Sequence, residues 1–250
     1  MAQRHAQRPV ATLFSDELID RGRSLTLGAD EAQHARVLRL AIGDRVRVTD
    51  GAGRVGVGTL VRHSKSHAVV DVDDVRHLDA PPAIHLLVPV ADRERMLLLA
   101  EKATELGAAS WRPVLWRRSR SVAPRGEGVT FHGKLRARML AALTQSGGGW
   151  LPTVYPEASL ERALAAAPDG ARLLLEAAGE PILRRVRSAP VICAVGPEGG
   201  IEADERSQLL AEGFDPVSLA PSILRFETAS IGALAVIRAA LIASEEFPRG

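Results

Sequence analysis

Apolar and polar residues alternate along the first third of the chain. This period of two predicts short strands at residues 24–27, 45–48, 54–57 and 68–75. Asp50-Gly51-Ala52-Gly53 separates the middle two strands and is typical of a hairpin turn. Residues 30–40 instead carry Ala32, Ala35 and Leu38 at helical spacing. The pattern predicts a small β-rich domain over residues 1–78.

The pattern changes after Asp79-Ala80-Pro81-Pro82, which has the composition of a linker. Residues 84–90 form a near-continuous apolar run, as in a strand that helices cover on both faces. Asp92 is placed to cap the following helix, which Gly107 ends. Further helices are predicted at 131–145 and 157–167, and a strand at 171–176. This succession of buried strands and helices predicts an α/β domain over residues 79–250.

Residues 191–205 have the layout of a ligand-binding loop. Residues 191–195 read as a buried strand, glycines 196, 199 and 200 permit a sharp turn, and acidic residues open a helix. Open α/β sheets bind ligands where a strand gives way to a helix in this way. The lysine of a phosphate-binding loop is absent, the GxGxxG spacing is absent, and Glu198 would repel a phosphate. A cofactor with ribose hydroxyls, an amino group or a positive centre fits better.

The same layout follows about twenty residues later. Residues 216–220 read as a strand, 221–226 as a loop, and an apolar helix runs from Glu227 to about Ser244. Two successive units of this kind would place two ligand-facing loops side by side. By the same strand-end argument, Leu175 and Glu176 would form a third wall of the site.

Two motifs in these loops resemble a known family. GPEGGI at 196–201 and LAPSILRFETAS at 219–230 are similar to the carboxyl end of the ribosomal small subunit methyltransferase E family, which belongs to the SPOUT superfamily of knotted methyltransferases. KATELG at 102–107 and HARVLR at 34–39 resemble further segments of that family. The resemblance implies a trefoil-knotted parallel sheet flanked by helices, preceded by a small PUA-like β-barrel that contacts RNA.

The resemblance also implies a cofactor and a reaction. The cofactor is S-adenosylmethionine, and the reaction is methylation of uracil N3 in 16S ribosomal RNA of the small ribosomal subunit. The cofactor-binding residues expected on this basis are Leu175, Glu176, Gly196, Pro197, Glu198, Gly199, Gly200, Leu219, Ala220, Leu224, Arg225 and Thr228. No metal is expected.

Three residues are candidates for catalysis. Uracil N3 carries a proton whose loss near neutral pH needs a base or stabilisation of the developing anion. Arg225 would donate to a carbonyl oxygen of the base, while Glu227 would take the proton or orient Arg225. Glu198 is the other carboxylate, and the sequence does not rank the two. Helix capping alone is the alternative explanation for Glu227 and Thr228.

Charge adds a possible RNA surface. The formal net charge of the 250 residues is only +2, but all except three of the 32 Lys and Arg residues are arginine. Arginines 112, 117, 118, 120 and 125 gather near Trp111 and Trp116, which would suit RNA or a solvated face equally. The expected RNA contacts are Arg36, Arg39, Lys102, Arg117, Arg118, Arg120 and Gln145.

Some positions depart from the family pattern. Thr144 stands where glutamate is usual, Gly148 and Ser222 where arginine is usual, and Ala220 where glycine is common. These departures leave open the alternative that the protein is an RNA-binding or ribosome-assembly factor of the same fold that has lost activity. A ribose 2′-O methyltransferase is a second alternative, and a nucleotide-dependent oxidoreductase, which lacks its fingerprint here, a third.

The remaining expectations concern location and assembly. No apolar run reaches the length of a membrane span, and residues 1–9 have no apolar signal segment, so a cytoplasmic protein with no membrane partner is expected. The single cysteine, Cys193, reads as a small buried apolar residue. The final helix is apolar enough to pack within the subunit and on a second copy, and the resemblance implies a homodimer.

Overall fold

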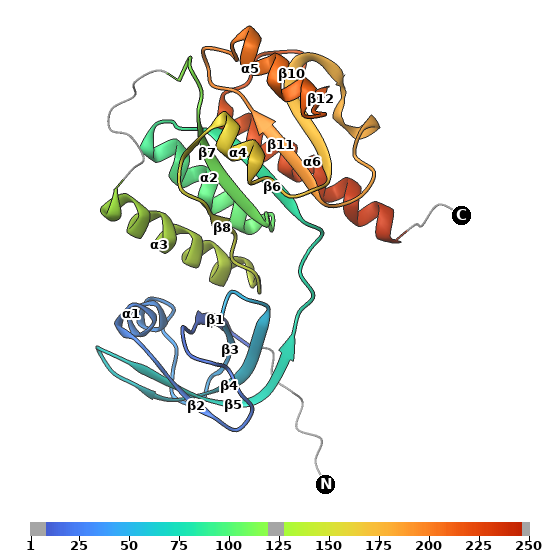
Figure 1. Ribbon diagram of the computed structural model, residues 1–250. Coiled ribbons are helices and arrows are strands. Elements are labelled where there is room, and N and C mark those ends of the chain that lie inside the picture. Colours follow the sequence, from blue (N-terminus) through green and yellow to red (C-terminus); the bar gives the residue numbers. More distant parts are fainter. Residues whose placement is uncertain (1–8, 120–127, 247–250) are drawn as a thin grey trace. The chain divides into compact units, whose positions relative to one another are not determined.

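Two separate β-sheets organise the chain, each with its own hydrophobic core (Figure 1). The computed structural model describes residues 9–119 and 128–246. Contacts between residues group the chain into two units: the first contains the residues up to Ala80 together with Leu140–Leu151, and the second contains Pro81–Met139 and the chain from Pro152 onward.

The first unit is the β-rich part that the alternating pattern predicts. Its sheet has the order β1-β3-β4-β5-β2, with β1 and β3 parallel and the other neighbours antiparallel. Leu13, Leu25, Val46 and Leu60 belong to its core. The strand β1 was not predicted, and the helix α1 is shorter than expected. The elements are β1 (Ala11–Phe14), β2 (Ser24–Leu27), α1 (Ala29–Val37), β3 (Arg45–Thr49), β4 (Arg54–His63) and β5 (Ala68–His77).

The segment Leu140–Leu151 packs on the hairpin turn of this first unit. The Gly53 amide donates to the Gly149 carbonyl at 2.8 Å, and the Leu151 amide donates to Gly51 at 2.8 Å. Gly53 has φ +93°, and a Cβ there would lie 2.4 Å from Trp150 Cζ2, so glycine is required. The predicted domain ranges 1–78 and 79–250 stay a prediction. The grouping by contacts differs from them, because it places this segment with the first unit.

The second unit contains a parallel sheet with the order β12-β10-β11-β6-β7-β8, and β9 also pairs with β7. The parallel α/β sheet is therefore confirmed, although β7, β8 and β9 were not predicted. Because the strands are parallel, their carboxyl ends lie at one edge of the sheet. The remaining elements are β6 (Ile84–Pro89), α2 (Arg93–Glu105), β7 (Ser110–Leu115), α3 (Val129–Ser146), β8 (Thr153–Val154), β9 (Ala158–Ser159), α4 (Leu160–Ala165), β10 (Ala171–Pro181), η1 (Ile182–Arg184), β11 (Val191–Val195), α5 (Ala203–Ala211), β12 (Asp215–Ser218) and α6 (Phe226–Glu246). The residues of α3 from Leu140 onward are grouped with the first unit.

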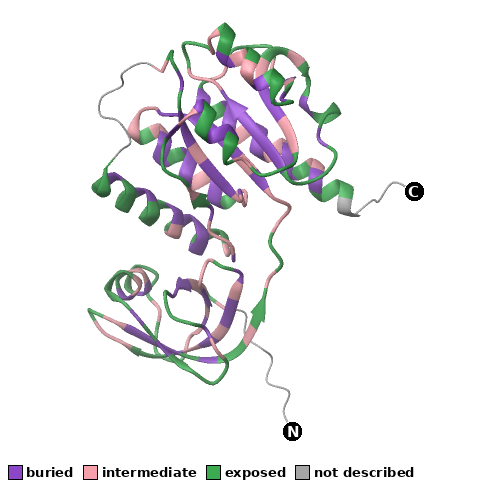
Figure 2. Ribbon diagram, viewed as in Figure 1, coloured by how far each residue is buried: buried purple, intermediate pink, exposed green. Residues whose placement is uncertain are grey.

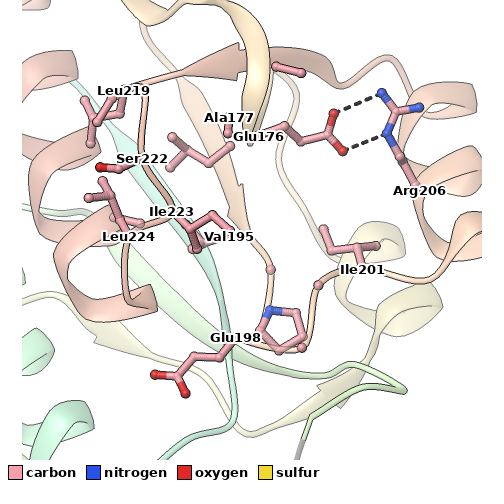
Figure 3. A pocket seen from close by; sticks show the side chains of 18 residues that line it. Glu176, Ala177, Val195, Glu198, Ile201, Arg206, Leu219, Ser222, Ile223 and Leu224 are labelled. Carbon is pink, nitrogen blue, oxygen red and sulfur yellow. Dashed lines mark hydrogen bonds and ion pairs between the residues drawn. The ribbon is translucent and has the colours of Figure 1, made fainter.

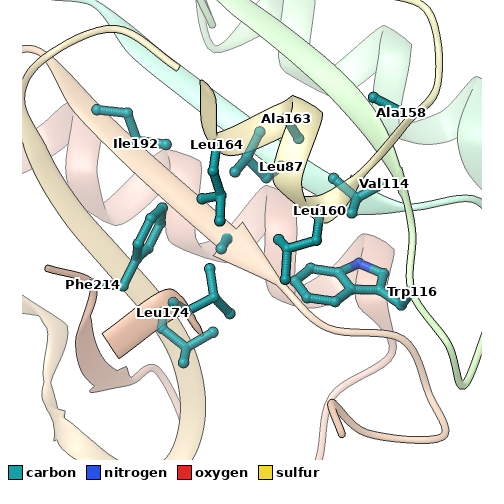
Figure 4. Packing of buried hydrophobic residues seen from close by; sticks show 12 residues of the cluster. Leu87, Val114, Trp116, Ala158, Leu160, Ala163, Leu164, Leu174, Ile192 and Phe214 are labelled. Carbon is teal, nitrogen blue, oxygen red and sulfur yellow. The ribbon is translucent and has the colours of Figure 1, made fainter. Parts of the chain in front are cut away.

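Helices bury both faces of this sheet. All five residues of β11 are buried, although successive side chains point to opposite faces, so both faces are covered (Figure 2). One core contains Leu160 and Leu164 of α4, Leu209 of α5 and Ile192 of β11 (Figure 4). Helix α6 packs on α2, β6 and β11.

Cys193 lies in the middle of β11 and is completely buried. Burial raises the pKa of its thiol to about 12, because the thiolate would be desolvated. The residue therefore serves as a small apolar core side chain, as expected, and not as a nucleophile.

Helix α6 corrects the expectation that no apolar stretch reaches the length of a membrane span. Residues Phe226–Ser244 are long and apolar enough, with a mean hydropathy of 1.6, but 44% of that stretch is buried within the structure. The packing of α6 on two strands and a helix explains its apolar composition as that of a core helix.

Candidate active site

A cavity of about 710 Å³ lies at the carboxyl edge of the parallel sheet (Figure 3). Three segments form its walls: the end of β10, the turn after β11, and the loop between β12 and α6. Ten of the twelve predicted cofactor-binding residues line it, namely Leu175, Glu176, Gly196, Pro197, Glu198, Gly199, Gly200, Leu219, Ala220 and Leu224. The sheet thus brings together segments that are up to about fifty residues apart in sequence, because parallel strands end at one edge.

The turn after β11 owes its shape to its glycines. Gly200 has φ +79°, and its amide donates to the Pro197 carbonyl at 2.8 Å. A Cβ on Gly196 would lie 2.6 Å from Cγ1 of Ile201, which also lines the cavity. Helix α5 then begins with a capping box, in which the Glu202 amide donates to Glu205 at 3.0 Å. Local sequence therefore holds this wall in place.

An ion pair that the sequence did not predict stands in the cavity wall. Arg206 of α5 donates from Nε and Nη2 to the two carboxylate oxygens of Glu176, at 2.7 and 2.9 Å (Figure 3). Such a two-pronged contact is favoured by the planar guanidinium. The pair presents both a cation and an anion to a zwitterionic ligand, and Arg206 joins the predicted residues of the site.

A smaller cleft of about 60 Å³ shares Pro197, Glu198 and Gly199 with the large cavity. In Figure 3 the Glu198 carboxylate points away from the other labelled side chains of the cavity. It forms an ion pair with Arg95 in the first turn of α2. This hydrogen bond raises the pKa of the Arg95 guanidinium above its ordinary value. Glu198 therefore lies where the two hollows meet.

The three predicted catalytic residues are placed differently from one another. Glu227 is buried in the first turn of α6, and its Oε1 lies 3.8 Å from Nε of Arg95. The cation beside Glu227 is Arg95, so the predicted role of Glu227 in orienting Arg225 stays a prediction. Arg225 and Thr228 are exposed and do not line the large cavity. A helix start turns successive side chains in different directions, which separates these neighbours in sequence.

The predicted RNA contacts fall into two groups. Arg36, Arg39 and Gln145 are exposed. Lys102, Arg117 and Arg118 are instead engaged with carboxylates within the second unit: Lys102 with Glu101 and Glu105, Arg117 with Asp204, and Arg118 with Glu202. Arg120 and Arg125 lie outside the described residues.

The tryptophans near the arginine cluster belong to the core. Trp111 is fully buried, and Trp116 packs against Leu160 and Val114 (Figure 4). They therefore do not offer exposed rings to RNA in this structure. The described arginines of the cluster also find internal partners, and Arg112 lies over the ring of Tyr155 at 4.5 Å.

The four departures from the family pattern lie in different parts of the structure. Thr144 is buried, and its hydroxyl donates to the Leu140 carbonyl at 3.1 Å, so it completes the packing of α3. Ser222 is exposed and lines the large cavity, as does Ala220. Gly148 lies in the segment Leu140–Leu151, which is grouped with the first unit. None of the four interrupts the cavity wall.

Comparison with known proteins covers both units. The RNA methyltransferase domain family matches residues 79–238, and the RNA methyltransferase PUA domain family matches residues 27–73. The chain is 31% identical over 216 residues to ribosomal RNA small subunit methyltransferase E of Synechocystis sp., across 82% of this chain and 69% of that protein. It is 30% identical over 243 residues to the protein of that name from Mycobacterium bovis, across 91% of both chains.

The fold is similar to that of a solved relative. A crystal structure of ribosomal RNA small subunit methyltransferase E from Neisseria gonorrhoeae, bound to S-adenosyl methionine, superposes with a TM-score of 0.83 and 25% identity. The match covers 92% of this chain and 98% of that one.

Proposed function

Because the chain belongs to the ribosomal RNA small subunit methyltransferase E family, we propose that it transfers the methyl group of S-adenosylmethionine to N3 of a uridine in 16S ribosomal RNA. Its architecture, a PUA-like amino-terminal domain and a parallel sheet flanked by helices, agrees with this membership. The observation that carries the proposal is the cavity that three strand ends form around the glycine turn 196–200.

The residues of the cavity suit S-adenosylmethionine. Leu219, Ile223 and Leu224 provide an apolar wall for the adenine, and the glycine turn leaves room for close approach of the ribose. The Glu176 and Arg206 pair offers partners of both signs to the zwitterionic methionine end. When bound, the cofactor supplies an electrophilic methyl group on sulfur.

Glu198 is the better placed of the two carboxylates to act as the base. It lines both hollows, and its side chain is 51% exposed, whereas the Glu227 side chain is 9% exposed. Glu198 would take the N3 proton as N3 bonds to the methyl carbon. The electrons of the carbon–sulfur bond remain on sulfur, which becomes a neutral thioether, and Glu198 then releases the proton to water.

The strongest alternative is an inactive RNA-binding or assembly factor of the same fold. Against it, the cavity wall is complete despite Ala220 and Ser222, and Glu198 retains a reachable carboxylate. A ribose 2′-O methyltransferase would use the same cofactor cavity, so the modified atom must be determined directly.

The proposal is tested in two steps. Isothermal calorimetry should show saturable binding of S-adenosylmethionine to the purified protein. RNA from a deletion strain should then gain N3-methyluridine on incubation with protein and cofactor, detected by mass spectrometry. Cofactor binding followed by 2′-O-methylation would favour the ribose alternative, and RNA affinity without cofactor binding would favour the inactive factor.

Replacing Gly200 with alanine is expected to weaken S-adenosylmethionine binding by about five- to thirtyfold, because holding a side chain at positive φ in the binding conformation of the turn costs roughly 1–2 kcal/mol. Gly213→Ala is the matched control, since Gly213 has φ +82°, has nothing within 4 Å of a built Cβ, and does not line the cavity. Calorimetry would measure both affinities. Equal affinities in the two variants would contradict a role for this turn.

We also propose that the protein is a cytoplasmic homodimer that acts on the small ribosomal subunit or its RNA. Ile242 of α6 is 43% exposed and offers apolar surface for a second copy. Multi-angle light scattering at micromolar concentration tests the dimer, and a monomeric mass would count against it.

A further inference from the structure

The Arg95 side chain lies between the two carboxylates that the sequence left unranked. It forms a close ion pair with Glu198, and its Nε is 3.8 Å from Glu227. Asp92 fixes the start of α2 by accepting from the amides of Glu94 and Arg95, at 3.0 and 3.3 Å. One cation is thus held by a helix start and flanked by two anions from other elements.

The two anions differ in what they can do. Glu227 is buried, and burial of a carboxylate is unfavourable unless a cation compensates it. Its Oε1 lies 3.8 Å from Nε of Arg95, so it gives the guanidinium a buried partner. Glu198 is half exposed on a turn, so a substrate can displace it from Arg95. The guanidinium therefore has one buried partner and one exchangeable partner.

Arg95 also faces the small cleft beside the cofactor cavity. The cleft is lined by Arg95, Glu198 and Gly199, together with the buried Phe226 ring and Ser119. Among residues 9–119 and 128–246, the buried Ser119 hydroxyl has no hydrogen-bond partner. A ligand here would touch the glycine turn that forms one wall of the large cavity. An apolar ring, a cation and a free hydroxyl suit a flat polar heterocycle.

We propose that this cleft takes the uracil ring of the target nucleotide and that Arg95 donates to a uracil carbonyl oxygen as N3 loses its proton. The proposal rests on the function proposed above. As uracil enters, Glu198 leaves the guanidinium and accepts the N3 proton. The negative charge left on the ring spreads onto its carbonyl oxygens, where a guanidinium stabilises it. Arg95 thus takes the role that sequence suggested for Arg225.

Other cations near the cleft are less suited to this role. Arg118 also lines it, but its Nε and Nη2 are bound to the Glu202 carboxylate at 2.6 and 3.1 Å. Arg225 is exposed and does not line the cleft. Only Arg95, among the described cations that line the cleft, combines a buried carboxylate partner with an exposed one.

Arg95→Met is expected to lower kcat by about 10²- to 10³-fold, the usual cost of removing one donor to a developing anion. The affinity for S-adenosylmethionine, measured by calorimetry, should change little. Arg95→Lys should retain part of the rate, because it keeps the charge but loses the planar fork. Arg138→Met is the matched control, since Arg138 forms an exposed ion pair with Glu101 elsewhere in the same unit.

A modified substrate separates this role from a structural one. RNA containing 5-fluorouridine has a more acidic N3, so its anion needs less stabilisation. The loss of rate in Arg95→Met should therefore be clearly smaller on that RNA than on uridine RNA. A structural role would lower both rates by the same factor. Should Arg95→Met fail to fold, the same comparison is made with Arg95→Lys.

The outcomes distinguish this proposal from the function on which it rests. Wild-type protein that forms no N3-methyluridine would refute the proposed function. If the wild-type protein is active, three results would each overturn the role of Arg95. They are a near-wild-type kcat in folded Arg95→Met, an equal loss of rate on both RNAs, and a loss of cofactor binding in that variant.

Discussion

Replacing Glu198 with glutamine is expected to lower kcat for methyl transfer by about 10²- to 10⁴-fold, the range that general bases contribute. Glutamine has nearly the same shape but cannot accept the N3 proton. S-adenosylmethionine should still bind, because the glycine turn keeps its backbone. Single-turnover methylation of uridine RNA measures the rate, and calorimetry measures the affinity.

A matched carboxylate variant tests whether the effect is specific to Glu198. Glu180→Gln serves as the control, because Glu180 is an exposed carboxylate of the same unit that pairs with Arg185. Near-wild-type kcat in Glu198→Gln, with a large loss in Glu227→Gln, would assign the base to Glu227 instead.

Replacing Arg238 with methionine is expected to lower the free energy of unfolding by about 3 kcal/mol or more, since hydrogen bonds from charged groups contribute roughly 1.5–3 kcal/mol each. Arg238 of α6 is buried and donates to three carbonyls, at Leu106 (3.1 Å), Pro82 (2.7 Å) and Gly107 (2.6 Å). Methionine keeps an apolar stem but leaves these carbonyls, two of them at the negative end of α2, without the guanidinium.

Denaturant unfolding followed by tryptophan fluorescence measures this effect, since Trp111 and Trp116 are buried in the same unit. Arg187→Met, which alters an exposed arginine, is the control and should change stability little. A loss of less than about 1 kcal/mol in Arg238→Met would show that water replaces the guanidinium at these carbonyls without cost.

Much of the cofactor cavity could be predicted because its walls are local structures. Apolar residues 191–195 specify a buried strand, the glycines specify the turn, and acidic residues start α5, all within fifteen consecutive residues. The loop 219–224 follows the same logic. Glu176 could be assigned to the same site because the carboxyl ends of parallel strands lie at one edge of the sheet.

The RNA contacts expected from charge stay predictions. The spacing of arginines near Trp111 says nothing about their partners. The fold supplies Asp204 of α5 for Arg117, and Glu202, the residue before α5, for Arg118. The trefoil knot and the homodimer stay predictions, because each depends on how distant parts of the chain thread or meet.

The sequence by itself determined the family, the β-rich and α/β parts, and ten residues of the cavity wall, since short-range patterns encode strands, turns and helix starts. Only the tertiary structure decided which charges meet. Arg95 and Glu198 are separated by 103 residues, and Arg238 and Gly107 by 131. The periodicity of a helix marks which side chains share a face, but the packing of other elements against that face decides which of them becomes a buried donor or part of the site.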